Sequence, residues 1–167
     1  MRRFSVMIVC LCMVVVACGG GMAAHRPKGV IPVQGGTTIE GYGLAVDASF
    51  DPSLDSLVPG YHVVNVALVN SSMNLVFLSP EQDRWFIRTV AGKKRQAITD
   101  LRRANPRAWA HIPERARTLM TYPLVIPIGG RMVLDLFVPD DTPIDSLTEV
   151  IVTIDSLGAT FAIAINQ

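Results

Sequence analysis

Apolar and polar residues alternate with a period of two along most of the chain that follows residue 37, a pattern typical of half-buried β-strands. The long alternating segments are 38–48, 61–72, 131–139 and 148–166, and the shorter ones are 75–78, 85–90 and 119–126. A turn at 155–158 divides the last long segment, which predicts a terminal β-hairpin. About seven to nine strands separated by turns favour an all-β sandwich over a barrel.

The alternation also predicts which side chains form the core, because every second residue of a strand points to the same face of its sheet. The residues predicted to share the core face are Tyr42, Leu44, Val46, Val64, Val66, Leu68, Met132, Leu134, Leu136, Val150, Val152, Ile154, Phe161, Ile163 and Ile165.

Residues 93–117 interrupt the alternation and read KKRQAITDLRRANPRAWAHIPERAR. Asn105-Pro106 is typical of a helix N-cap followed by proline at the first helical position, and Pro113 limits this helix to fewer than two turns. We expect a partly helical insertion between two strands, with Trp109 and Ile112 as its contacts to the sandwich.

The beginning of the chain has the composition of an export signal. Arg2 and Arg3 precede fourteen almost unbroken apolar residues at 4–17. A membrane-spanning helix needs roughly 20 such residues, so the stretch fits a secretory signal better. It ends in Val15-Val16-Ala17-Cys18, which resembles the lipobox of bacterial lipoproteins. In that family the cysteine thiol receives a diacylglycerol, and the signal is cut before the cysteine.

The lipobox resemblance implies that residues 1–17 are removed and that Cys18 carries a covalent diacylglycerol or acyl lipid. The other two cysteines leave with the signal, so the mature chain would hold no free thiol. Two or three acyl chains anchor a protein stably, whereas one binds marginally. Residues 18–36 are predicted to form a flexible tether, followed by one domain at 37–167. Glycine rather than aspartate follows the cysteine, which favours the outer membrane if the source has two membranes.

Three further segments resemble the uncharacterised immunoglobulin-like domains attached to bacterial lipoprotein signals. A strand VVNVALVNSS ends in asparagine and a polar turn, an IPIGG turn comes later, and the strand RMVLDLFVP ends in an apolar-Phe-x-Pro motif. The matching positions are 64–70, 127–130 and 134–139, within a resemblance that covers residues 38–165. It implies an immunoglobulin-like antiparallel β-sandwich with a binding or structural role, and it supplies no catalytic residues.

The sequence lacks the local signatures of catalysis and metal binding. Its three histidines do not have the spacing of a local metal site. It has no G-x-S-x-G motif, and no phosphate loop follows the glycine pair at 129–130. The aspartate clusters at 47–55 and 140–145 lack EF-hand spacing and are typical of turns. We therefore expect a protein that is not an enzyme and that has no metal or other cofactor beyond its lipid.

The insertion at 93–117 is strongly basic. It contains eight basic and two acidic residues, which gives it a net charge of +6. The basic residues are Lys93, Lys94, Arg95, Arg102, Arg103, Arg107, Arg115 and Arg117. Arginine outnumbers lysine, which suits bidentate contacts to phosphate or carboxylate groups. One interpretation is an anion-binding surface for lipid phosphates, an envelope polymer or an acidic protein. The other is a solvated face, or one that pairs with acidic residues of the same domain.

The sequence predicts a lipid-anchored, exported protein of the bacterial cell envelope that has a binding or structural role. Its expected contacts are the membrane, through the lipid anchor, and an envelope protein or anionic envelope polymer. Nucleic acid is not expected as a partner of an exported chain, and the oligomeric state is left open. The alternatives are an accessory subunit of an envelope assembly, whose sheet edge adds to a partner strand, and a hydrolase whose site no local motif reveals.

Overall fold

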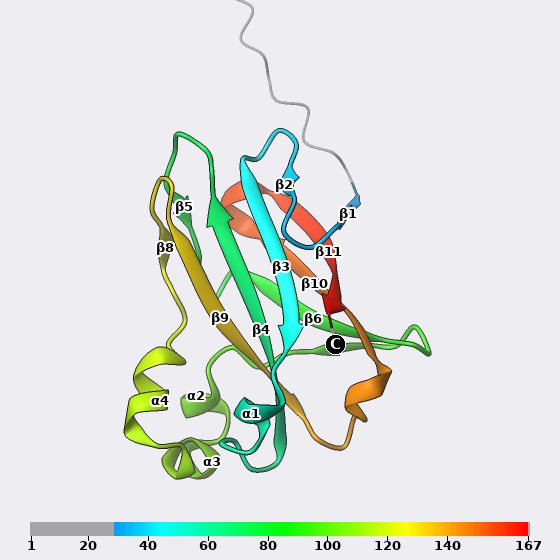
Figure 1. The fold of residues 1–167 in the computed structure, drawn as a ribbon, viewed down its shortest axis with the longest axis vertical. Helices are drawn as coiled ribbons and strands as arrows, with labels where there is room; N and C mark the ends of the chain where they lie inside the picture. The colour runs from blue at the N-terminus through cyan, green and yellow to red at the C-terminus, as the bar shows by residue number, and fades with distance from the viewer. Residues whose placement is uncertain (1–28, 167) are drawn as a thin grey trace, which may run out of the picture.

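The computed structural model describes residues 29–166, which form a mostly β domain with four short helices (Figure 1). The predicted signal peptide, the lipobox that ends in Cys18 and the first part of the predicted tether lie outside the described residues. The strands are β1 (Val30–Val33), β2 (Thr38–Ile39), β3 (Leu44–Phe50), β4 (Tyr61–Asn70), β5 (Val76–Phe77), β6 (Arg84–Thr89), β7 (Lys94–Gln96), β8 (Val125–Ile126), β9 (Arg131–Pro139), β10 (Leu147–Ile154) and β11 (Ala159–Asn166). The helices are α1 (Pro52–Asp55), α2 (Leu101–Ala104), α3 (Pro106–His111) and α4 (Glu114–Leu119), with 3₁₀ turns η1 (Ile144–Ser146) and η2 (Asp155–Leu157).

Nine strands form one mixed sheet in the order β7-β6-β10-β11-β3-β4-β9, with β1 beside β11 and β2 beside β3. Most pairs are antiparallel, but β11 pairs in parallel with both β1 and β3, so the expectation of a wholly antiparallel sheet is wrong. The sheet curls until β3, β4 and β9 face β6, β10 and β11 across a shared core (Figure 1). Ile98, just after β7, forms an isolated bridge with Phe137 of β9, which links the two ends of the strand order.

The main core consists of the side chains that the alternation predicted. All fifteen residues named for the core face are either buried in this cluster or packed against it. The ring of Tyr42 stands edge-on to that of Phe161, with the ring centroids 5.3 Å apart. The terminal hairpin is confirmed as well, because β10 and β11 pair across a turn that ends at Gly158 with φ of 58°. Glycine adopts this left-handed conformation without the steric cost that other residues incur.

The predicted tether extends too far along the chain. Residues 30–33 form β1, which pairs with β11 so that Val33 lies opposite Ile163. Ile31 and Val33 contact the main core. The sheet domain therefore begins by residue 30, because VIPV pairs with β11, and within it Val33 is buried and Ile31 is half-buried.

The strand predicted at 119–126 is also wrong over most of its length. Helix α4 ends at Leu119, and only β8 at the far end of the segment is extended. Met120 is buried among the helices instead of in a strand. Pro123 lies between the two elements, and proline has no amide hydrogen to donate to a sheet ladder.

Helices α2, α3 and α4 follow β7 and pack on the opposite face of β4 and β9 from the main core. A second core joins them to this sheet face, and it consists of Val58, Val63, Leu101, Ala108, Ile112, Met120 and Phe137. The predicted N-cap is confirmed, because the Asn105 side-chain oxygen accepts a hydrogen bond from the Ala108 amide at 3.1 Å. The predicted contacts are confirmed too: Ile112 is 1% exposed, and Trp109 packs against the same cluster.

Candidate functional site

The structure divides the eight basic residues of the insertion between two parts of the molecule. Three lie on the β6–β7 hairpin, which ends the sheet order, and five lie on the helices. The hairpin residues are Lys93, Lys94 and Arg95. The helical residues are Arg102, Arg103, Arg107, Arg115 and Arg117.

Arg95 ties the hairpin to the connection between β9 and β10. Its Nη1 donates to Asp141 Oδ1 at 2.5 Å and its Nη2 donates to Asp141 Oδ2 at 2.9 Å, while Nη1 also donates to the hydroxyl of the buried Thr142. The hydrogen bond from Arg95 lowers the pKa of the Asp141 carboxyl below its usual value, and the same bond raises the pKa of Arg95. This bidentate geometry fixes the hairpin in place, while Lys93 and Lys94, at the turn and in β7, have no ion pair within residues 29–166.

Strand β6 adds two arginines on the outer face of the sheet, the face that Lys94 shares because it lies opposite Arg88, whereas Arg95 lies opposite the core residue Ile87. Trp85 and Ile87 are buried in the main core, so Arg84, Phe86 and Arg88 point away from it. Nη1 of Arg88 donates to Glu149 on β10 at 2.7 Å, and both side chains are about one-third exposed. Such a partly exposed pair contributes little to stability.

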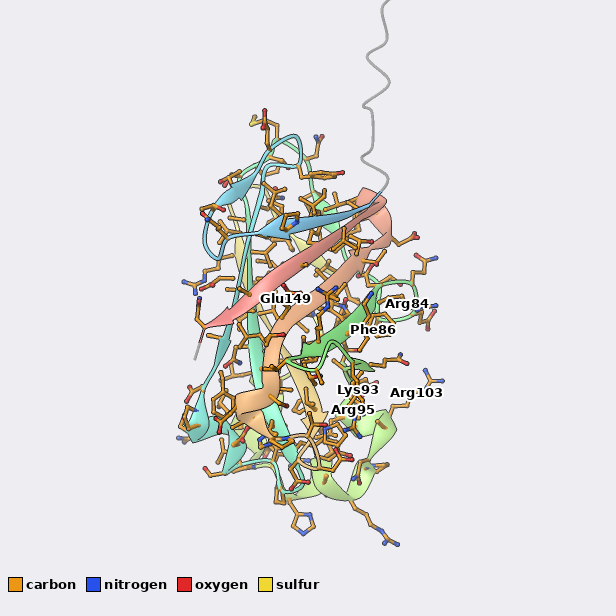
Figure 2. The ribbon with its side chains drawn as sticks, turned by 90° about the vertical axis from the view of Figure 1, so that its right-hand side faces the viewer. Arg84, Phe86, Lys93, Arg95, Arg103 and Glu149 are labelled. Carbon is orange, nitrogen blue, oxygen red and sulfur yellow. The ribbon has the colours of Figure 1, made fainter. Side chains whose placement is uncertain are left out.

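These residues form a surface that we define as the basic strip: Arg84, Arg88, Lys93, Lys94, Arg95 and Arg103. Figure 2 shows Arg84, Lys93, Arg95 and Arg103 on the side of the molecule that carries β6 and β7, with Glu149 nearer to β11. Two of the six cations have an ion-pair partner, Arg95 with Asp141 and Arg88 with Glu149, and the other four have none within residues 29–166. The basic strip therefore keeps a net positive charge.

An open hollow of about 600 Å³ lies beside the hairpin. Lys93, Lys94 and Arg95 line one part of it, and Asp141, Thr142 and Ser146 from the connection between β9 and β10 line another. Because the guanidinium of Arg95 is already bound to Asp141, the two lysine ammonium groups are the charges that a ligand in the hollow would meet first.

The other arginines of the insertion have different surroundings. Arg102 lines a separate cleft of about 330 Å³ together with Trp109 and Tyr122. Arg107 and Arg115 are exposed on α3 and α4. The Nε of Arg117 is buried, and it has no hydrogen-bond partner within the described chain.

The wall of the cleft beside Arg102 includes Tyr122, which belongs to a network of hydrogen-bonded polar side chains. Tyr122 donates its hydroxyl hydrogen to Asp83 Oδ2 at 2.9 Å and accepts a hydrogen bond from Trp85 Nε1 at 3.0 Å. Asp83 also accepts hydrogen bonds from the amides of Ser79 and Asp155. Burial is the main reason why the pKa of Tyr122 is raised. The Asp83 carboxylate accepts three of these hydrogen bonds and so joins separate loops, which indicates a structural role.

One histidine–carboxylate pair resembles two members of a catalytic triad. His62 Nδ1 lies 2.5 Å from Asp55 Oδ2, and Asp55 Oδ1 accepts a hydrogen bond from the Val63 amide at 2.7 Å. The ring of His62 also stands edge-on to Phe50. No serine or threonine hydroxyl within residues 29–166 hydrogen-bonds to this imidazole, so the pair lacks the nucleophile that a triad requires. Over the same residues, no three histidine, cysteine, aspartate or glutamate side chains are grouped as a metal site.

Comparison of the chain with protein-family models, with curated proteins and with solved structures found no match. No helix between residues 29 and 166 has both the length and the apolar composition needed to cross a membrane.

Sequence reasoning missed Arg84 and Arg88, which lie outside the basic insertion. The signal was present in the segment RWFIR, where alternation places both arginines on the face opposite Trp85 and Ile87. Their proximity to Lys94 depends on the pairing of β6 with β7, in which Arg88 lies opposite Lys94. The local charge of the insertion did not reveal that pairing.

Proposed function

We propose that this chain is a lipid-anchored, exported protein of the bacterial envelope that binds an anionic envelope component through the basic strip and performs no catalysis. The anchor is a lipid on Cys18, as the lipobox resemblance implies. The ligand class is a polymer or protein surface that carries repeated phosphate or carboxylate groups. The domain is an immunoglobulin-like sandwich, in which the two halves of the curled sheet serve as the layers.

The observation that carries this proposal is that cations from β6, β7 and α2 gather in the part of the molecule around β6 and β7, where Arg88 and Lys94 lie opposite each other on the outer face of the sheet. A strand and its neighbour present a row of side chains at regular spacing, which suits a ligand with repeated charges better than a single small anion. The two hairpin lysines have no ion pair within residues 29–166, so binding an anion there does not require breaking an existing contact.

Charge reversal at the hairpin tests the proposal. The double variant Lys93→Glu, Lys94→Glu is compared with Arg107→Glu, Arg115→Glu, which makes the same change in net charge on α3 and α4. The mature anchored protein, kept in neutral detergent, is titrated into fluorescent polyphosphate at low salt, and binding is followed by anisotropy.

We expect the hairpin variant to bind on the order of tenfold more weakly than the wild type, since each exposed charge pair contributes up to about 1 kcal/mol. The helix variant should lose much less affinity, and salt near 1 M should abolish the difference. Equal losses of affinity in the two variants, or wild-type binding that does not depend on salt concentration, would reject the basic strip as the binding surface.

A further inference from the structure

Large apolar side chains are exposed together at one place on the molecule. Ten such residues are exposed within the described chain, and six of them lie in the two segments 73–77 and 124–128. We call these six the apolar tip: Met73, Leu75, Phe77, Leu124, Val125 and Ile128. Met73 is 84% exposed and Leu124 is 62% exposed. Contiguous apolar surface of this kind marks contact with a membrane or another protein, whereas single exposed residues need no explanation.

The apolar tip is built on the small two-stranded sheet of β5 and β8. Val76 and Ile126 pair in this sheet and are buried in the main core. Their neighbours Phe77 and Val125 also pair, and both are exposed on the other face. The sheet therefore attaches the tip to the domain through one face and exposes apolar residues on the other.

Asn70 holds the loop of the tip in a defined conformation. Its side chain is fully buried, and its Nδ2 donates to the carbonyl oxygens of Asn74 and Ile126 at 2.8 and 3.1 Å. Its Oδ1 accepts hydrogen bonds from the amide and hydroxyl of Ser72. Met73 lies between Ser72 and Asn74, so its exposure follows from a hydrogen-bonded loop geometry.

The charge of the surrounding segments fits a lipid surface. The two segments 71–79 and 123–131 contain no carboxylate, and their one charged residue is Arg131. Two adjoining turns each carry an acidic residue: Glu40 lies in the connection between β2 and β3 that packs against Ser72 through Gly43, and Asp155 lies in η2, where its neighbour Ser156 donates its hydroxyl hydrogen to the Phe77 carbonyl at 2.6 Å. An apolar surface with a neighbouring cation is suited to the acyl boundary and the anionic headgroups of a bilayer.

The position of the chain start points to the same occupant. Eleven residues separate Cys18 from β1, and a chain of that length reaches at most about 40 Å. β1 lies at the same end of the molecule as β5 and β8, the upper end in Figure 1, whereas the four helices lie at the lower end. An anchor on Cys18 would hold the apolar tip close to the bilayer.

We propose that the apolar tip docks on the surface of the bilayer that carries the lipid anchor, so that the domain is held at the membrane by two contacts. This inference rests on the anchoring part of the proposed function. The tip supplies an orientation: the helices face away from the membrane, while the basic strip remains open to a ligand from the side.

Site-directed fluorescence on the anchored protein tests the proposal. The variant Met73→Cys receives a polarity-sensitive label, and the full lipid-bearing chain is reconstituted into vesicles of phosphatidylcholine and phosphatidylglycerol. Half of the samples contain lipids with a nitroxide on the acyl chain as quencher. The matched control is Val90→Cys, which is 73% exposed in the turn between β6 and β7.

We expect the label at position 73 to shift to shorter wavelength and to be quenched several-fold more than the label at position 90. Replacing Leu75 and Phe77 with serine should reduce the quenching at position 73, and both are exposed enough to leave the fold intact. Equal, weak quenching at both positions in protein that still floats with the vesicles would overturn the docking proposal and favour a protein partner for the tip. Loss of flotation by the wild-type chain would overturn the anchor, and the docking proposal with it.

Discussion

The substitution Ile112→Ala measures how firmly the second core attaches the helices to the sheet. Ile112 is 1% exposed and contacts a cluster that includes Val63 of β4 and Phe137 of β9. The change removes three buried carbons at about 0.8 kcal/mol each and leaves a cavity, so we expect a loss of about 3 kcal/mol in the free energy of unfolding. Leu119→Ala is the control, because Leu119 is 80% exposed on α4 and should change stability by less than about 0.5 kcal/mol.

The assay is urea unfolding at neutral pH, followed by far-ultraviolet circular dichroism and by tryptophan fluorescence. Trp85 reports on the main core and Trp109 on the second core, so Trp85→Phe and Trp109→Phe backgrounds separate the two signals. The helices share their core with β4 and β9, so both tryptophans should report the same midpoint. A loss below about 1 kcal/mol for Ile112→Ala would show that the helices do not depend on this contact. Loss of the Trp109 signal well before that of Trp85 would refute the single cooperative unit.

Two further predictions concern backbone geometry and buried charge, again measured by urea unfolding. Gly43→Ala should lower the free energy of unfolding by about 2 kcal/mol or more, because φ at Gly43 is +60° and a Cβ there would lie 2.7 Å from the Ser72 Cβ. The control Gly92→Ala, at φ of +75° with open space around it, should lower it by about 1 kcal/mol. Equal losses in the two variants would contradict this reasoning. Burial raises the pKa of Asp135 from 3.8 in spite of a hydrogen bond from Asn65, so the ionised carboxylate destabilises the fold at neutral pH. This destabilisation is absent below pH 3.8 and complete above the raised pKa, so the stability of the wild type should fall as pH rises between these values. Asp135→Asn should remove that fall. An unchanged dependence of stability on pH in the variant would contradict the raised pKa of Asp135.

Period-two alternation was sufficient to predict the main core and the terminal hairpin. Each strand of the core pairs or packs with several others, so its buried face is visible in the sequence without knowledge of which strand lies next to it. The parallel pairing of β1 and β3 with β11 could not be predicted in this way, because local alternation does not specify strand direction or order. For the same reason the sequence marked VIPV as tether, although pairing with β11 buries Val33.

The candidate binding surface was predictable only in part. The net charge of the insertion drew attention to Lys93 and Lys94, and both line the hollow beside the hairpin. The same reasoning named Arg95 as a possible anion-binding residue and left open that the basic residues pair with acidic ones of the same domain; the structure pairs Arg95 with Asp141, 46 residues further along the chain. The apolar tip was not predicted, because Phe77 and Val125 follow an alternating pattern that is equally consistent with burial, and only the pairing of two short strands at the edge of the molecule leaves them exposed.

Both proposals depend on a lipid at Cys18, and intact-mass spectrometry of the native protein measures it directly. The protein is extracted from its own membranes in neutral detergent, and a Cys18→Ser variant is processed in parallel. We predict a chain that begins at residue 18 and carries the added mass of a diacylglyceryl group with or without an amide-linked acyl chain. A native chain that retains residues 1–17, or one with a free thiol at Cys18, would contradict the account.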